Sequence, residues 1–321
     1  MANTPSNRLV YKVLDGQDID VEAYLPPLSG NIRGAGQPVI IDIHGGAFML
    51  GASGMVNKDQ VEDCLNRGWI VLVPNHRLCP QVNLLEGPMK DIRDLLAWIH
   101  DGGLQKELSI LERGDYKVDL DYVFAFGTSS GGTLALSLGF DVPRPVAGIY
   151  DMYGPCNFAD AFWTIPVAHV KAKLPPLTED FISKIFDERP VPIVGGVSLE
   201  GQANPGGPNF NDPRVAFAMT QIGNGTVMDA IFPSKEWKKV DPLLNLSSTF
   251  PPTYIVHGQA DTMVPLSLSK DLYAALQKAG VKCGMTEVPG EEHTFAGKMK
   301  IGTQTWDLQR KGFDFLESLI V

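Results

Sequence analysis

The sequence contains only four cysteines, and they form no metal-binding or redox pattern. They are widely separated, and none belongs to a CxxC pair or a Cys/His cluster: Cys64, Cys79, Cys156 and Cys283. Structural zinc sites and small disulfide-rich scaffolds show recurrent cysteine spacings, so both classes are disfavoured. We expect reduced thiols, which are typical of a cytoplasmic protein, and no bound metal.

Long apolar runs and clusters of basic residues are also missing. No segment approaches the roughly 18 apolar residues of a membrane-spanning helix, and residues 1–13 lack the apolar core of a signal peptide. The formal net charge is −10, and no run of Lys or Arg could neutralise phosphates. We therefore expect a cytoplasmic protein with neither nucleic acid nor membrane as a partner. The sequence leaves open whether it is a monomer or a homodimer.

What the sequence does contain is an alternation of short apolar runs with longer helical patterns. The runs are continuous, which is typical of strands buried on both faces of a parallel sheet, and cover residues 38–44, 69–75, 122–127, 145–153 and 252–258. Apolar residues recur at helical spacing in 89–102, and 267–280 has helix start and stop signals. Segments 8–16 and 18–26 predict an antiparallel hairpin at one sheet edge. The predicted fold class is therefore α/β, with a mainly parallel central sheet flanked by helices.

Between residues 155 and 240 this alternation stops. The segment is rich in Pro, Gly and Asn, notably in 201–213, and aromatic residues are scattered through it: Phe158, Phe162, Trp163, Phe181, Phe186, Phe217 and Trp237. Long insertions in compact domains often cover a site, so we expect a cap over a pocket with apolar walls. The alternative is a helical excursion with a small core of its own. We therefore divide the chain into a catalytic domain, 1–154 and 241–321, and a cap, 155–240.

The segment GTSSGG follows a predicted strand and precedes a predicted helix. The pattern G-x-S-x-G fits it with Gly127, Ser129 and Gly131. A frame centred on Ser130 fails, because Thr128 stands where that frame needs glycine. A sharp turn from strand to helix strains its central residue and leaves the neighbours no room for side chains. Ser129 is therefore the candidate nucleophile, although the pattern alone also fits an ordinary tight turn.

A serine nucleophile needs a base, and the base needs an acid that orients it. Asp261 follows the predicted strand at 252–258, and His293 follows the next one. Ligands and catalytic groups of open α/β sheets collect at the carboxyl ends of the strands. The order Ser, Asp, His is also that of hydrolases with a nucleophile elbow. We therefore predict Ser129, Asp261 and His293 as the catalytic residues.

Neighbouring histidines and acids have other interpretations. His257 ends a strand, and we expect it to position the loop that leads to Asp261. Glu291 and Glu292 are too close to His293 in sequence to orient it easily. These residues are therefore not predicted to be catalytic.

Attack on an acyl carbon creates an oxyanion, which needs N–H donors that are already in place. The segment HGGAF closes the predicted strand at 38–44, and its glycines let the backbone approach a substrate. We predict the N–H groups of Gly45 and Gly46 as donors, together with that of Ser130, the residue after the nucleophile.

With these motifs in order, the chain resembles the hormone-sensitive-lipase-like carboxylesterases, a family with the α/β-hydrolase fold. HGGAF resembles the family's HGGG motif, VPNHRLCPQ its N-Y-R-L-A-P segment, GTSSGG its G-D-S-A-G-G elbow, and HGQAD and EEHTF its acid and base segments. The resemblance covers nearly all of the chain outside 155–240. It implies that Ser129 is the nucleophile, that His293 is the general base and then the acid, and that Asp261 orients it. No cofactor is implied.

Four positions depart from the family pattern. Ala47 replaces the third oxyanion glycine, and Thr128 replaces the acidic residue before the nucleophile. His76 and Cys79 replace the tyrosine and alanine of the arginine segment. The first change narrows the space near the acyl oxygen, and the second removes a charge beside the site. The departures point to a specialised substrate rather than to simple short-chain esters.

We therefore expect a serine hydrolase of the carboxylesterase type. It would cleave an ester or thioester of a small, partly apolar molecule through an acyl-enzyme on Ser129. One alternative uses the same residues for acyl transfer, lactone formation or product release in a biosynthetic pathway. Another is a small-molecule receptor on the same fold, which the presence of all three predicted catalytic residues disfavours.

Overall fold

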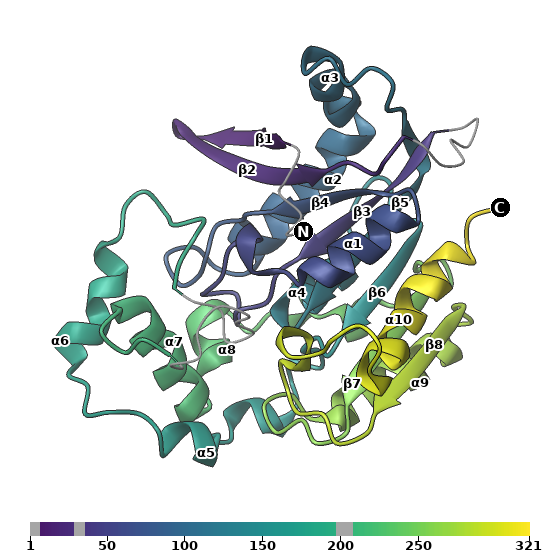
Figure 1. Ribbon diagram of the computed structural model, residues 1–321. Coiled ribbons are helices and arrows are strands. Elements are labelled where there is room, and N and C mark those ends of the chain that lie inside the picture. The colour runs from purple at the N-terminus through teal and green to yellow at the C-terminus, as the bar shows by residue number, and fades with distance from the viewer. Residues whose placement is uncertain (1–6, 29–35, 197–207) are drawn as a thin grey trace.

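A computed structural model describes residues 7–28, 36–196 and 208–321 of the chain. Within these residues eight strands form one sheet, in the order β1-β2-β4-β3-β5-β6-β7-β8 (Figure 1). They are Asn7–Leu14 (β1), Gln17–Tyr24 (β2), Gln37–Ile43 (β3), Ile70–Pro74 (β4), Val118–Thr128 (β5), Gly148–Met152 (β6), Thr253–Gly258 (β7) and Cys283–Val288 (β8). β2 is antiparallel to both neighbours, whereas β4, β3, β5, β6, β7 and β8 are parallel. The prediction of a mainly parallel sheet with an N-terminal hairpin at its edge is confirmed.

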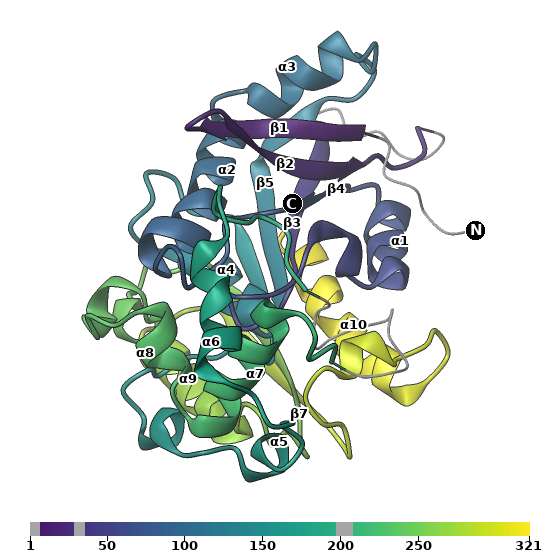
Figure 2. The same cartoon turned by 90° about the vertical axis from the view of Figure 1, so that its left-hand side faces the viewer.

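Helices cover both faces of this sheet. Figure 2 shows α2 and α4 on one side of the strands and α1 and α10 on the other. Side chains of a strand alternate between the faces: Ile41 of β3 belongs to the core under α2, α4 and α9, and Ile40 to the core under α1 and α10. These helices and the adjoining α3 are Lys58–Asn66 (α1), Lys90–His100 (α2), Gly103–Ile110 (α3), Ser130–Leu136 (α4), Leu266–Lys278 (α9) and Gln304–Glu317 (α10).

Short helices complete the framework. The helix predicted for 89–102 ends earlier, at His100. Its helical backbone begins earlier than predicted, because a π-helical turn at Leu85–Met89 (η2) leads into α2. Other single turns are Ser53–Met55 (η1), Ser137–Gly139 (η3), Pro242–Asn245 (η7) and Phe295–Gly297 (η8). Among the described residues, no helix has both the length and the apolar character needed to cross a membrane.

Between residues 155 and 240 the described part of the chain forms helices that lie together to one side of the sheet (Figure 1). They are Ala161–Thr164 (η4), Ala168–Lys171 (α5), Glu179–Ile182 (α6), Ser183–Asp187 (η5), Pro213–Asn224 (α7), Val227–Ile231 (α8) and Trp237–Lys239 (η6). Phe158 packs edge-on against Trp163 and Trp237, and Phe186 against Phe217, and the buried apolar residues of the segment join the core on the α2 and α4 face of the sheet. Of the stretch 201–213, residues 201–207 lie outside the described residues.

Candidate active site

Ser129 lies at the turn between β5 and α4, where the strand ends at Thr128 and the helix begins at Ser130. Its backbone has φ 51° and ψ −126°, a strained conformation that costs on the order of 1–3 kcal/mol. The neighbouring glycine makes the turn possible, because a Cβ on Gly131 would lie 2.0 Å from the carbonyl oxygen of Ile43. The segment therefore has the geometry of a nucleophile elbow.

The three side chains predicted to be catalytic meet at the carboxyl edge of the sheet. Ser129 Oγ lies 2.9 Å from His293 Nε2, and His293 Nδ1 lies 2.7 Å from Asp261 Oδ2. Asp261 follows β7 and His293 follows β8, so three separate strand ends supply the group. The distances allow a proton to pass from the hydroxyl to the imidazole while the carboxylate orients the ring.

Asp261 is buried and accepts several hydrogen bonds. Its Oδ1 accepts from the N–H groups of Met263 and Val264, each at 2.9 Å, and its Oδ2 faces His293 and His257. Burial alone raises the pKa of this carboxyl. The charge of His293 and the hydrogen bonds of both imidazoles outweigh that effect, and the pKa lies well below its usual value. Asp261 is therefore ionised at neutral pH.

His257 is fully buried, and both of its ring nitrogens have partners. Its Nδ1 lies 2.8 Å from Ser269 Oγ, and its Nε2 lies 2.9 Å from the Val264 carbonyl oxygen. A carbonyl oxygen only accepts, so Nε2 carries a proton and donates it to this oxygen. The same N–H lies 3.1 Å from Asp261 Oδ2. The sequence predicted that His257 positions the loop before Asp261, but not this direct contact with the carboxylate.

Tyr153 is a site residue that the sequence analysis missed. Its ring lies edge-on to the ring of His293, with centroids 4.9 Å apart and planes at 62°. It also packs against Phe295, so the imidazole has an aromatic wall that limits its rotation. The available signal was its place at the end of the apolar run 145–153, at the same sheet edge as Ser129.

The loop after β3 has an unusual backbone. Three consecutive residues have positive φ, 127° at Gly46, 54° at Ala47 and 62° at Phe48. These three residues line the cavity in front of Ser129, whereas Gly45 lies outside its wall. The part of this loop that reaches the cavity therefore begins at Gly46, one residue later than the predicted pair of donors. We call residues 46–51 the oxyanion loop, after the donors that the sequence predicts there.

Two buried histidines stack beside the oxyanion loop. The ring centroids of His44 and His76 are 4.7 Å apart, and the planes differ by 11°. Burial, together with the neighbouring His76, lowers the pKa of His44 to about 3, and burial also lowers that of His76. Both rings are therefore neutral at pH 7, and the histidine that departs from the family pattern packs on the histidine of the HGGAF motif.

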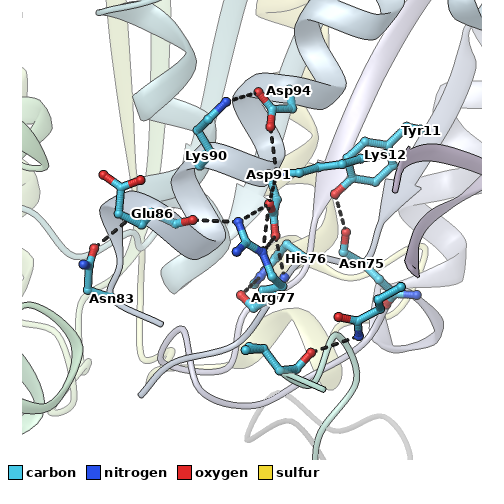
Figure 3. Close-up of polar contacts among 12 residues, drawn as sticks. Tyr11, Lys12, Asn75, His76, Arg77, Asn83, Glu86, Lys90, Asp91 and Asp94 are labelled. Carbon is cyan, nitrogen blue, oxygen red and sulfur yellow. Dashed lines mark hydrogen bonds and ion pairs between the residues drawn. The ribbon is translucent and has the colours of Figure 1, made fainter. Parts of the chain in front are cut away.

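Arg77 fixes the segment that carries His76 (Figure 3). Its guanidinium binds the Asp91 carboxylate at 2.7 and 2.9 Å, and its backbone N–H donates to the same group at 2.9 Å. Lys12 of β1 pairs with Asp91 at 2.5 Å, and the Asp91 side chain is fully buried. Removing one partner from a buried ion pair costs about 3–5 kcal/mol, because a buried charge is left uncompensated. The segment is therefore a firm support for the histidine stack.

A cavity of about 70 Å³ opens in front of Ser129 and His293. Most of its wall consists of apolar side chains from the oxyanion loop, from residues 155–240 and from the segment after β7: Ala47, Phe48, Phe162, Trp163, Ile165, Val167, Ile222, Val227, Met228, Met263 and Val264. Among these described wall residues, His293 is the one ionisable group. The wall therefore suits an uncharged, apolar ligand. Phe162 and Trp163 thus pack among the cap aromatics and also face the cavity.

In the part of the chain that the structure describes, neither metal ligands nor reactive thiols accompany the site. Within 7–28, 36–196 and 208–321, no group of three or more His, Cys, Asp or Glu side chains could hold a metal ion. The four cysteines are free, and burial raises the pKa of each thiol. Thiolates are the nucleophilic form of cysteine, so none of the four is a candidate nucleophile.

Two family models match separate parts of the chain. The model named BD-FAE matches residues 24–166, which contain the oxyanion loop and Ser129. The model of the prolyl oligopeptidase family matches residues 214–320, which contain Asp261 and His293. The two matches together include all the catalytic candidates.

Curated relatives with similar sequences are much longer proteins. A non-reducing polyketide synthase of Aspergillus calidoustus is 29% identical over 331 residues, which cover 90% of this chain and 13% of the synthase. A non-reducing polyketide synthase of Preussia isomera is 29% identical over 329 residues, which cover 95% of this chain and 14% of the synthase. The chain thus spans about one seventh of the length of these relatives.

Solved structures share the fold at low sequence identity. A structure of Thermogutta terrifontis esterase 2 phosphoramylated by tabun has a TM-score of 0.64 at 16% identity, and the match covers 99% of this chain and 96% of the esterase. A Staphylococcus aureus protein of unknown function has a TM-score of 0.71 at 20% identity, with 98% of this chain and 100% of that chain covered. The sheet order, the elbow and both family models agree with these matches. The chain has the α/β-hydrolase fold, and the two family models together with the esterase neighbours support a serine hydrolase of the carboxylesterase type.

Proposed function

We propose that this serine hydrolase cleaves an ester or thioester of a small, largely apolar molecule through an acyl-enzyme on Ser129. The observation that carries the proposal is the continuous chain of contacts from Ser129 Oγ to His293 and from His293 to Asp261, at 2.9 and 2.7 Å, on the floor of an apolar cavity. Both distances lie within the range that proton transfer in a Ser-His-Asp group requires.

The chemistry follows from the positions of these atoms. Ser129 Oγ attacks the acyl carbon while His293 Nε2 accepts its proton, and Asp261 stabilises the imidazolium. His293 then gives the proton to the leaving alcohol or thiol. Water, activated by the same nitrogen, attacks the acyl-enzyme and releases the acid.

We place the oxyanion donors at the N–H groups of Gly46, Ala47 and Ser130. Gly46 and Ala47 line the cavity beside the nucleophile, and Ser130 opens α4, where the first N–H groups have no partner inside the helix. This assignment keeps two of the predicted donors and replaces Gly45 with Ala47. A backbone N–H serves equally well from alanine, so the departure from the family's third glycine leaves the donor in place.

The cavity wall indicates the substrate class. Phe162, Trp163 and Met228 supply aromatic and flexible apolar surface, and the described wall holds no ionisable group besides His293. Burial of an unpaired charge there is unfavourable, so the part of the substrate inside the cavity is uncharged. We further propose a cytoplasmic protein, monomeric or homodimeric, that takes a small molecule as its partner; its four free thiols support that location.

A second candidate function uses the same acyl-enzyme to release or transfer the product of a biosynthetic pathway. Similarity to polyketide synthases over 90–95% of the chain favours it. An acyl group that is assembled as a thioester needs an acceptor for its release. The acceptor is water in a hydrolase, an external alcohol or amine in an acyltransferase, and a hydroxyl of the acyl group itself in lactone formation. The steps up to the acyl-enzyme are the same in all three cases.

Labelling with a fluorophosphonate, followed by peptide mapping and by assays on p-nitrophenyl esters and acyl thioesters, tests both candidates. We expect stoichiometric labelling at Ser129 and none in Ser129→Ala. Release of free acid in water supports the hydrolase, and transfer of the acyl group to added alcohols or amines in preference to water supports the second candidate. A chain that is folded yet neither labelled nor acylated is a receptor, and both proposals fail.

A further inference from the structure

The oxyanion loop holds a strained backbone that needs external support. Gly46, Ala47 and Phe48 have positive φ in succession, and two of them carry side chains. Such conformations persist only where surrounding contacts determine them. Inside the loop, the N–H groups of Met49 and Leu50 both donate to the Gly46 carbonyl, at 3.0 and 2.8 Å. The remaining anchors come from elsewhere in the chain.

Arg214 supplies the most heavily bonded of these anchors. It is the second residue of α7, and its side chain is 2% exposed. Its Nη1 donates to the carbonyl oxygen of Met49 at 2.7 Å and to that of Cys79 at 2.8 Å. One guanidinium nitrogen therefore joins the oxyanion loop to the segment 73–81, which contains Arg77 and Cys79.

The rest of the guanidinium is equally committed. Its Nε donates to Glu188 Oε2 at 3.0 Å, its Nη2 donates to Gln81 Oε1 at 2.8 Å, and Nη2 also pairs with Glu188. Gln81 in turn donates to the Glu188 carboxylate at 2.8 Å. With acceptors on three of its sides, the planar guanidinium has one orientation available to it.

Two further contacts place the same part of the cap against the loop. Gly51 and Gly195 exchange backbone hydrogen bonds of 2.7 and 3.1 Å, as an isolated pair of bridged residues. The N–H of Leu78 donates to the Pro192 carbonyl at 2.8 Å. The cap segment 188–196 and Arg214 therefore hold the far end of the oxyanion loop, while the Cys79 N–H holds the Phe48 carbonyl at 2.9 Å.

We infer that Arg214 is a positioning residue for the oxyanion donors, so that the rate of acyl transfer depends on a cap side chain that does not line the substrate cavity. The inference rests on the proposed function. Arg214 fixes the Met49 carbonyl three residues after Gly46 and two after Ala47, and this fixes the plane of the turn that carries their N–H groups. A shift of about 1 Å at such donors lowers the rate by roughly 100-fold.

The test compares Arg214→Met and Arg214→Lys with Arg67→Met. Arg67 is a matched control, because its side chain is 5% exposed and binds Asp63, Asp314 and Glu317 between α1 and α10, away from the site. In Arg214→Met we expect kcat on p-nitrophenyl esters to fall by about 10- to 100-fold with KM changed less than threefold. Arg214→Lys keeps the charge but not the fork, and should recover part of the loss. Arg67→Met should keep the wild-type kcat, even if its thermal stability falls as far.

Hydrogen exchange of the peptide containing residues 46–51 separates this inference from the proposed function. Arg214→Met should lose protection there at least tenfold relative to Arg67→Met, whether or not the enzyme accepts the chosen ester. Unchanged protection and unchanged kcat in Arg214→Met overturn the inference and leave the hydrolase proposal standing. If Arg214→Met loses protection but the wild type never labels at Ser129, the hydrolase proposal is overturned instead.

Discussion

His257 and His293 contact the same oxygen of Asp261, at 3.1 and 2.7 Å. The Asp261 carboxylate thus contacts two imidazoles, one of which faces Ser129 and one of which is buried in the core against Ser269. The buried imidazole has both ring nitrogens engaged, and its Nε2–H acts as a fixed donor. It therefore helps to hold the carboxylate in the plane that His293 needs.

His257→Leu should lower kcat/KM about tenfold. The substitution removes one donor from a buried carboxylate, and a tenfold loss corresponds to ~1.4 kcal/mol, which is within the usual contribution of a hydrogen bond to a charged group. Ester hydrolysis at a fixed folded fraction measures it, and Ser269→Ala, which leaves the donor to Asp261 intact, is the control. Equal kcat/KM for His257→Leu and wild type would show that Asp261 is held without this contact.

Met228→Ala should shift the substrate preference toward longer acyl chains. Met228 lines the cavity, so its truncation enlarges the space for the ligand, whereas Met219 is similarly buried but lies outside the cavity wall. A series of p-nitrophenyl esters of increasing length gives the preference as ratios of kcat/KM. Met219→Ala should lose comparable stability, about 2–5 kcal/mol, without a change in those ratios. A shift of the same size in both variants would mean that the cavity wall is assigned wrongly.

The wild type should lose folding stability as the pH rises from about 4 to about 7, and Asp151→Asn should remove this loss. Burial raises the pKa of Asp151 to about 7, only partly offset by the hydrogen bond from the Gly154 N–H. The folded chain holds this proton up to about pH 7, whereas the unfolded chain releases it near its ordinary pKa of about 4. The folded state binds more protons in that window, so its stability falls as the pH rises, by up to ~4 kcal/mol.

Urea unfolding of wild type and Asp151→Asn at pH 5 and pH 8 checks this sign. The variant should gain stability relative to wild type at the higher pH. A difference between the two proteins that is the same at both pH values would show that Asp151 does not titrate in this range.

His76→Phe should show the opposite pH trend. The pKa of His76 is lowered by burial, so the unfolded chain takes up a proton below its ordinary pKa of about 6.5 while the folded chain does not. Wild type is therefore fully stabilised above that pH and loses stability as the pH falls, by up to ~1.4 kcal/mol per unit. Phenylalanine keeps a ring against His44 and removes the titration, so the variant should gain on wild type between pH 7.5 and 5 in the same unfolding assay. A gain with rising pH instead would contradict the assignment of a neutral stack.

Local patterns were enough to predict the framework and the catalytic candidates. Strands buried on both faces have continuous apolar runs, and the elbow requires Gly127 and Gly131 around Ser129. The strands and the elbow can therefore each be recognised within a single segment of the sequence. The boundaries were less accurate, as the π-helical turn before α2 shows, because it depends on how Pro88 and its neighbours pack.

Contacts between distant segments could not be predicted in the same way. Arg214 and Met49 are 165 residues apart, and no spacing rule connects an arginine at the start of a cap helix to a carbonyl in a strand-end loop. Gly45 and Gly46 were predicted from their residue type, but which residue faces the cavity depends on the backbone dihedrals of the loop. Tyr153 lay in a predicted strand end, and its contact with His293 depends on the fold of β8 and the loop after it.

The paired backbones of Gly51 and Gly195 have a consequence for engineering. A cap exchanged with that of a relative would break two backbone hydrogen bonds at the end of the oxyanion loop unless the new segment presented a residue in the same register. A Cβ at position 195 would also lie 2.4 Å from the Arg214 side chain, so the donor segment must bring a glycine there or a smaller residue at 214. Functional chimaeras of this enzyme are therefore expected to require grafting residues 46–51 together with 188–214 as one unit.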